Sequence, residues 1–174
     1  MCLLKVALLQ MTACGNNQAA NQVKGEAFYR HGCMMGADIA LFPEMWNNGY
    51  TFGDPAVPGK REHWLAQAVS QEDAFINHFR TLARELNMAI ALTYLEKWDG
   101  APRNSVSLID RHGQIVLTYA KVHTCEFSAE AELTPGEDFP VCTLNTGQGE
   151  VKLGFIESGR VGATPTEGPA ATTC

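Results

Sequence analysis

The chain has 174 residues, of which 45% are hydrophobic and 18% are charged, and its formal net charge is −6. This length and apolar content are sufficient for one globular domain with a substantial core. The acidic balance and the scattered positions of its 13 lysines and arginines exclude a clustered basic surface, so we expect no nucleic-acid partner.

The amino-terminal stretch MCLLKVALLQMTAC has a short apolar run, whereas a membrane-spanning helix needs roughly 18 or more apolar residues. No charged segment precedes this run, so it does not resemble a secretory signal. The six cysteines show neither paired spacing nor the density of a disulfide scaffold. We therefore expect a cytoplasmic protein with reduced thiols and no membrane association.

The first part of the chain combines two short apolar runs with one helical segment. Residues 3–10 and 37–44 have the length of strands, and the nearly continuous apolar character of the first predicts burial on both faces. Between them, Asn16 and Asn17 are suited to cap a helix. We expect that helix to turn its larger apolar side chains inward: Val23, Ala27, Phe28, Met34 and Met35.

The middle of the chain contains a loop, a helix and a strand. Residues 45–69 are rich in Asn, Gly and Pro turn pairs and are expected to be loop-like. Residues 70–87 carry a helical apolar face, and Ser70 followed by Asp73 resembles a capping box at its start. Residues 88–98 are apolar again and predict a further strand.

The later part of the chain predicts two hairpins. Segments 104–110 and 114–120 flank an Arg-His-Gly turn. An acidic loop at 124–140 leads to two more strands, at 139–146 and 150–156. The order of these elements predicts a mixed α/β fold in which helices cover a largely buried sheet.

Several charged residues stand where they could take part in chemistry. Glu44 follows Leu-Phe-Pro at the carboxyl end of a predicted strand, and a partly shielded carboxylate is suited to acid–base catalysis. Lys121 ends another strand, where an ammonium group can stabilise a developing oxyanion. Glu130 and Glu132 lie in the acidic loop and could return to the same cleft. Taken singly, each is explained better as a solvent-facing strand end or loop residue.

A metal site is a remote alternative. His123, Cys125 and Glu126 are close together in sequence, but no second group of ligands has matching spacing. We therefore expect no metal centre.

In chain order, the segments LFPEMWNNGY, RNSVSLIDRHGQIVLTYAKVH, LTPGEDF and VKLGF resemble the motif series of the nitrilase or carbon–nitrogen hydrolase superfamily. The resemblance covers about residues 3–156. It implies a four-layer αββα sandwich, of which this chain would form a part. It also implies hydrolysis of a non-peptide C–N bond in a small amide, carbamoyl compound or nitrile, with no metal or organic cofactor.

The resemblance implies a catalytic set of Glu, Lys and Cys. Glu44 matches the general base, and Lys121 matches the lysine that supports the tetrahedral intermediate. A second, orienting glutamate precedes the Leu-x-Pro-Gly turn. Glu130 is the better match for it, and Glu132 stays open because of a one-residue ambiguity in the alignment.

The pattern breaks where the nucleophile is expected. The cysteine should stand at the end of the strand beginning near Val151, but Ser158 occupies that column and Arg160 replaces the following aspartate. A serine needs a strong, aligned base, and no suitable histidine can be assigned. We interpret the nucleophile as missing, which leaves an incomplete hydrolase domain at 1–156 and a divergent, disordered tail at 157–174.

Two functional hypotheses follow. The first is a carbon–nitrogen hydrolase whose nucleophile is absent because of a truncation or frameshift. The second is an inactive fragment that at most binds a partner or a small amide-like molecule. Because a partial sandwich exposes apolar faces, we expect the chain to form homo-oligomers or to be aggregation-prone.

Overall fold

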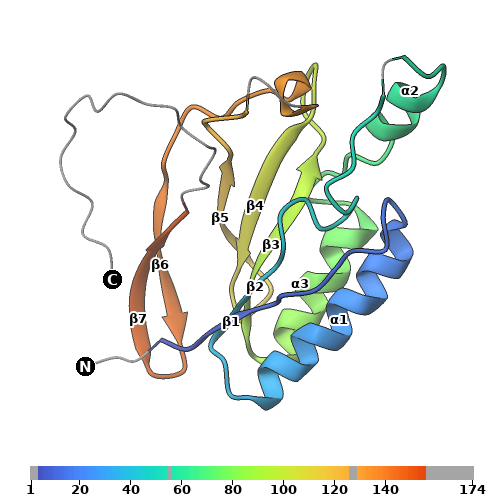
Figure 1. Ribbon diagram of the computed structural model, residues 1–174. Helices are drawn as coiled ribbons and strands as arrows, with labels where there is room; N and C mark the ends of the chain where they lie inside the picture. Colours follow the sequence, from blue (N-terminus) through green and yellow to red (C-terminus); the bar gives the residue numbers. More distant parts are fainter. Residues whose placement is uncertain (1–3, 55, 126–128, 156–174) are drawn as a thin grey trace.

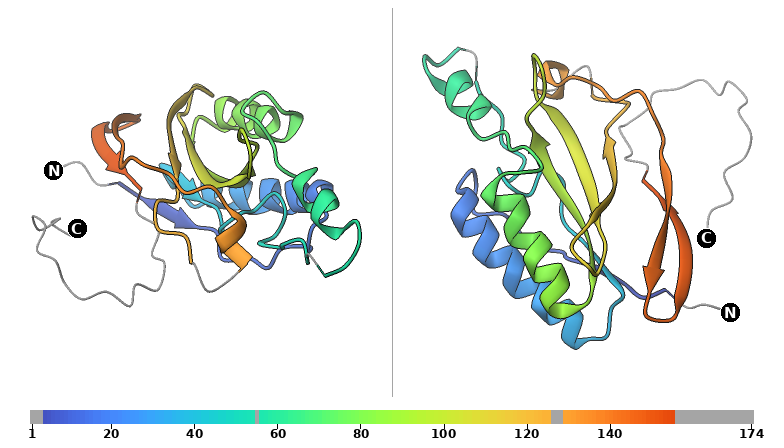
Figure 2. Two further views of the ribbon diagram at one scale, coloured as in Figure 1. Left: turned by 90° about the horizontal axis from the view of Figure 1, so that it is seen from above. Right: turned by 180° about the vertical axis from the view of Figure 1, so that it is seen from behind.

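The computed structural model describes residues 4–54, 56–125 and 129–155. A five-stranded sheet forms its centre, with the strand order β1-β2-β3-β4-β5. Two long helices cover one face of this sheet, and the hairpin of β6 and β7 lies along the other (Figure 1). Seen from behind, helices, sheet and hairpin form successive layers (Figure 2). The layering confirms the predicted α/β class and corresponds to a partial αββα sandwich.

The strands of the central sheet are β1 (Val6–Leu8), β2 (Ile39–Leu41), β3 (Ala89–Glu96), β4 (Arg103–Ile109) and β5 (Ile115–Ala120). β1, β2 and β3 pair in parallel, whereas β3–β4 and β4–β5 are antiparallel. The remaining elements are α1 (Gln18–Met34), α2 (Lys60–Leu65), α3 (Ala74–Leu86), the 3₁₀ turn η1 (Ala129–Glu132), β6 (Val141–Thr146) and β7 (Gly149–Gly154). None of the helices within the described ranges is long and apolar enough to cross a membrane.

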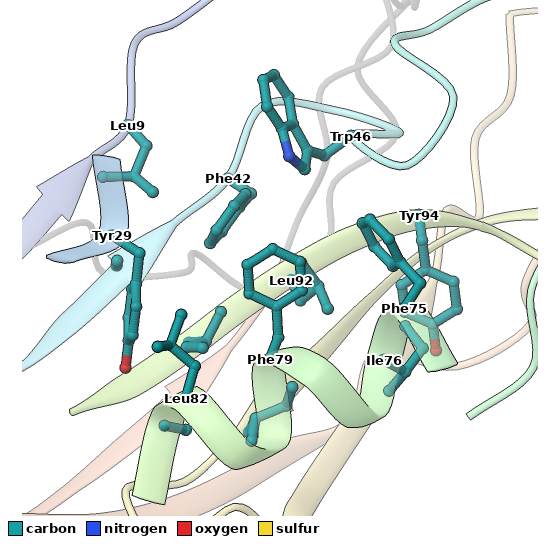
Figure 3. Close-up of a cluster of buried hydrophobic side chains, with 14 of the residues drawn as sticks. Leu9, Tyr29, Phe42, Trp46, Phe75, Ile76, Phe79, Leu82, Leu92 and Tyr94 are labelled. Carbon is teal, nitrogen blue, oxygen red and sulfur yellow. The ribbon is translucent and has the colours of Figure 1, made fainter. Parts of the chain in front are cut away.

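An apolar cluster fills the space between the helices and the sheet (Figure 3). The ring of Phe79 on α3 lies edge-on to those of Phe42 and Phe75, with centroids 5.1 and 5.2 Å apart. Alternate residues of β3, Leu92 and Tyr94 among them, face this cluster. The apolar face predicted for the helix at residues 70–87, which is α3, is therefore confirmed.

The start of α3 differs from the prediction by a few residues. Asp73 is the N-cap, so the helix begins at Ala74 rather than at Ser70. The Asp73 carboxylate accepts a hydrogen bond of 2.5 Å from the Ser70 backbone N–H. The Ser–Asp pair therefore shapes the turn before the helix. The loop expected at 45–69 also contains the short helix α2.

The inner face of α1 was predicted wrongly. The apolar residues expected to be buried are exposed instead: Val23, Ala27, Phe28, Met34 and Met35. The buried residues are Asn21, Gly25, Tyr29 and Gly32. A Cβ atom at Gly25 would lie 2.6 Å from Trp46 Nε1, so only glycine allows the helix to approach this closely. Small and polar residues form the inward stripe, and apolar periodicity does not detect them.

The first strand is shorter and more open than predicted. β1 is an edge strand that pairs with β2, and the side chains of Val6 and Leu8 are 49% and 62% exposed. The expectation of burial on both faces is therefore wrong for this strand. The other strand of the parallel pair, β2, has Ile39 and Ala40 buried.

The face of the sheet away from the helices packs against the hairpin. Its buried core includes Val106 and Leu108 from β4, Leu117 and Tyr119 from β5, and Leu144 from β6. Because side chains alternate along a strand, Asn104 and Lys121 continue this same face at one end of the sheet. This end holds the polar cluster described next.

Candidate active site

Three charged side chains, distant in sequence, meet at this end of the sheet. Lys121 Nζ lies 2.8 Å from Glu44 Oε1 and 2.9 Å from Glu130 Oε1. Glu44 follows β2, Lys121 follows β5, and Glu130 lies in η1. Glu132 points elsewhere and pairs with Arg61 at 3.2 Å. Of the two glutamates that the sequence left open, Glu130 is the one in contact with Lys121.

The backbone around Lys121 is anchored on both sides. Its N–H donates to Asn104 O at 2.8 Å, and its carbonyl accepts from the Gly136 N–H at 2.9 Å. A Cβ atom at position 136 would lie 2.2 Å from Ala120 O, so this close approach requires glycine. The Pro-Gly turn noted in the sequence thus packs directly on the strand end that carries the lysine.

Glu44 begins a tight turn that is fastened to β3. The Thr93 hydroxyl donates to Pro43 O, and the Leu95 N–H donates to Asn47 Oδ1 at 2.8 Å. Met45, directly after Glu44, is fully buried and has a φ of 47°, a left-handed conformation that is strained for a non-glycine residue. Strained backbone of this kind is found where surrounding structure holds a functional side chain in place.

Glu130 is buried and surrounded by donors. Its side chain is 1% exposed; Oε1 accepts from Lys121 Nζ and from the Tyr50 hydroxyl at 2.8 Å, and Oε2 accepts from the Cys125 N–H at 2.9 Å. Burial alone would raise the pKa of Glu130, but these hydrogen bonds outweigh it and hold the pKa below its usual range. Glu130 is therefore held as a carboxylate at neutral pH, hydrogen-bonded to Lys121 and Tyr50.

Lys121 is held as an ammonium ion. Burial opposes its charged form, but the hydrogen bonds that it donates to Glu44 and Glu130 outweigh burial and raise the pKa of Lys121 above its ordinary value. Its side chain is 5% exposed, whereas that of Glu44 is 37% exposed. Of the three groups, Glu44 is therefore the one that an incoming molecule can reach.

Two uncharged residues in this cluster were missed in the sequence. Asn104 Nδ2 donates to Glu44 Oε1 at 2.7 Å, and Tyr50 donates to Glu130. Partial desolvation of the Tyr50 hydroxyl and its bond to Glu130 raise the pKa of the phenol. Both residues lie inside segments that carry the family resemblance, but neither stands out by charge or periodicity.

The alternative metal site lies only partly within the described residues. Glu126 lies outside the described residues, and no group of three His, Cys, Asp or Glu side chains suited to a metal ion occurs within the described ranges. His123 is exposed. The expected tail at 157–174, including Ser158, also lies outside the described residues.

Comparison with known proteins connects this geometry to a family. The family model for carbon-nitrogen hydrolases matches residues 5–164. A curated relative from Pseudomonas protegens, the "Hydrolase in pqqF 5'region", is 32% identical over 160 residues, which are 88% of this chain and 50% of the relative. N-carbamoylputrescine amidase from Solanum tuberosum is 29% identical over 126 residues, covering 70% of this chain and 39% of that enzyme.

Among solved structures, an amidase from Nesterenkonia sp. superposes with a TM-score of 0.68 and 25% identity, covering 86% of this chain and 54% of that one. A mutant of that amidase was solved with the acetamide moiety of fluoroacetamide added covalently at its active site cysteine. A cysteine-to-alanine mutant was solved in complex with butyramide. The present chain spans about half the length of the relatives that it matches.

Proposed function

Because this chain belongs to the carbon-nitrogen hydrolase family, we propose that the Glu44–Lys121–Glu130 cluster is the acid–base part of an amidase-type site. Its substrate would be a small non-peptide amide or carbamoyl compound. The observation that carries this proposal is the buried ammonium group held between two carboxylates, one of which remains open to solvent.

In this proposal the charged groups have different tasks. Glu44 accepts the proton of a thiol as its sulfur attacks the carbonyl carbon of the substrate. The carbonyl oxygen becomes an oxyanion, and the Lys121 ammonium, held by Glu130, stabilises the negative charge. The C–N bond breaks, and the leaving nitrogen takes the proton from Glu44. Glu44 then activates a water molecule that hydrolyses the thioester.

We further propose that the thiol is missing from this chain. The sequence has Ser158 in the expected column, and a hydroxyl without an aligned base is a poor nucleophile. Residues 1–156 would then supply the base and the oxyanion partner of a site that binds amides without turning them over. The alternative is a chain that is inactive and does not bind amides at all.

Amide binding and amide turnover are tested separately. We expect butyramide, titrated into ¹⁵N-labelled protein, to shift resonances near Lys121 in the wild-type chain and not in Glu44→Ala. The wild-type chain should release ammonia from simple amides no faster than the Glu44→Ala variant does. Turnover that is lost in both Glu44→Ala and Ser158→Ala would instead establish a serine variant. Butyramide shifts that are the same in wild type and Glu44→Ala would refute the assignment of the site.

The surface and the cysteines support two further parts of the proposal. Val6, Leu8 and Val141 are 49%, 62% and 66% exposed, so we propose that the chain self-associates through apolar surface. Light scattering after size-exclusion chromatography tests this, and a monodisperse monomer that unfolds cooperatively would contradict it. We also propose a cytoplasmic location, in which cysteines stay reduced. Within the described ranges, Cys14, Cys33 and Cys142 are free thiols.

A further inference from the structure

We propose that Asn104 is a positioning residue that determines which oxygen of Glu44 accepts the proton. The inference rests on the proposed function, because it assigns Glu44 the part of general base. Asn104 Nδ2 donates to Glu44 Oε1 at 2.7 Å, and Lys121 Nζ donates to the same oxygen at 2.8 Å. Both donors therefore meet on one carboxylate oxygen.

The two oxygens of Glu44 are not equivalent in this arrangement. Oε1 accepts two hydrogen bonds, one of them from an ammonium ion, whereas Oε2 accepts none from any residue that the structure describes. The two hydrogen bonds occupy the lone pairs with which Oε1 could take a proton. The proton consequently goes to Oε2, and the carboxylate presents this oxygen to the nucleophile.

Asn104 is well placed to impose this orientation. It lies on β4, which pairs with both β3 and β5, and its backbone carbonyl accepts from the Lys121 N–H at 2.8 Å. Glu44, in contrast, lies in a turn. A side chain on a rigid central strand therefore holds a side chain on a turn, which is the arrangement that keeps a functional group in one geometry.

A purely structural role does not explain this asparagine. It is 1% exposed, and its Oδ1 atom is buried with no hydrogen-bond partner among the residues that the structure describes. Leaving an amide oxygen buried and unpaired destabilises a fold, so an apolar residue of similar size would serve the core better. The opposite amide orientation would bring two oxygens together at Glu44, so the carboxylate sets the orientation observed.

The first test reads the hydrogen bond itself and does not depend on turnover. The Asn104 side-chain amide protons are recorded by ¹H–¹⁵N NMR in the wild-type chain and in Glu44→Gln. We expect the Asn104 amide proton that is hydrogen-bonded to Glu44 to move upfield in Glu44→Gln, because its acceptor has lost the negative charge. Asn77, whose side-chain amide donates to the Glu72 carbonyl, is the internal control and should not move. Asn104 signals that are the same in both proteins would overturn the inference.

The second test separates positioning from folding. We expect Asn104→Leu to keep or raise the urea midpoint of unfolding. The same variant should reduce the resonance shifts that butyramide causes near Lys121, because Glu44 is no longer held in one orientation. Asn77→Leu, at an exposed position outside the cluster, is the matched control for both measurements. A lowered urea midpoint together with unchanged butyramide shifts would show a structural role and refute the inference.

The two proposals fail in different ways. A chain that neither binds butyramide nor releases ammonia refutes the proposed function. The Asn104 resonances still decide whether this side chain holds the Glu44 carboxylate, because they are recorded without any substrate.

Discussion

Glu96 and Glu130 are both buried glutamates near the same end of the central sheet, and they differ in what surrounds them. Glu96 accepts a hydrogen bond from the Ser105 hydroxyl at 2.7 Å, and burial raises its pKa. Glu130 accepts from an ammonium ion, a phenol and a backbone N–H, and its pKa is lowered. Burial by itself therefore does not create a charged site, because the donors decide which form of the carboxyl group is stable.

The surroundings of the two glutamates extend this difference. On the helix side of the sheet, near Glu96, the Tyr94 and Ser107 hydroxyls are 2.8 Å apart, and Ser107 and Thr118 are 2.9 Å apart. These neutral groups satisfy one another and join neighbouring strands. On the hairpin side, the charged cluster includes Glu44, which remains open to solvent. One polar region stabilises the sheet, and the other is suited to chemistry.

The largest effect is expected from removing the charge that holds the second region together. Lys121→Met leaves the Glu130 carboxylate buried without its ammonium partner, and breaking a buried ion pair typically costs about 3–5 kcal/mol. Urea unfolding at pH 7 measures the loss. Lys97→Met, at an exposed position, is the control and should change stability by less than about 0.5 kcal/mol. If both variants lost the same free energy of unfolding, the charged cluster around Lys121 would not differ from the rest of the molecule in the way that we propose.

Exchanging each buried carboxyl group for an amide tests the comparison directly. Glu130→Gln should destabilise the fold by about 1.5–3 kcal/mol at pH 7, because charge-assisted hydrogen bonds are lost. Glu96→Gln keeps the bond to Ser105 and removes a charge that burial disfavours, so it should be neutral or stabilising by less than about 1 kcal/mol. Urea midpoints of both variants at pH 7 provide the measurement. A similar loss of stability in Glu130→Gln and Glu96→Gln would contradict the conclusion that the surrounding donors, and not burial, distinguish the two glutamates.

The pH dependence of the two glutamates should have opposite signs. The folded pKa of Glu130 is lowered, so its contribution is present above its unfolded pKa of about 4.3 and is lost as pH falls through the folded value. The folded pKa of Glu96 is raised, so its contribution is present below about 4.3 and is lost as pH rises through the folded value. Glu96→Gln should therefore gain stability relative to wild type as pH rises. Unfolding series from pH 3 to pH 8 distinguish the two cases.

A glycine substitution tests how strongly the site depends on backbone packing. Gly136→Ala forces a methyl group against Ala120 O and should displace the turn that bonds to the Lys121 carbonyl, at a cost of about 1–3 kcal/mol. At Gly147 the nearest atom to an added Cβ is Arg111 Nη1 at 3.5 Å, so Gly147→Ala is the matched control. Thermal unfolding of both variants measures the difference. No excess loss at position 136 would mean that the turn adapts freely.

The smallest effect is expected from one neutral donor. Tyr50→Phe removes a hydroxyl from Glu130 but leaves the bonds from Lys121 and Cys125, so the loss should be about 0.5–1.5 kcal/mol. The pKa of Glu130 should rise towards its usual range, and ¹³C NMR of the carboxyl group follows this directly. A Glu130 pKa that does not change would show that the remaining donors are sufficient.

Several elements could be predicted because their signals are local. The β4–β5 hairpin follows from two apolar runs around a turn, and the apolar face of α3 follows from its 3.6-residue period. α1 could not be predicted in the same way. It packs through Gly25 and Gly32, which are needed because Trp46 and β1 lie so close to the helix backbone. No local pattern in the sequence encodes that distance.

The sequence by itself determined the α/β class, the family and the charged residues Glu44 and Lys121 at the ends of their strands, because apolar periodicity, turn residues and motif order are properties of nearby positions. Only the tertiary structure decided that Glu130 rather than Glu132 meets Lys121, and that Asn104 and Tyr50 join them. Lys121 and Glu44 are 77 residues apart in the chain, and Asn104 and Glu44 are 60 apart. Contacts over such separations depend on strand order and on the path of each turn, which the packing of the whole sheet sets.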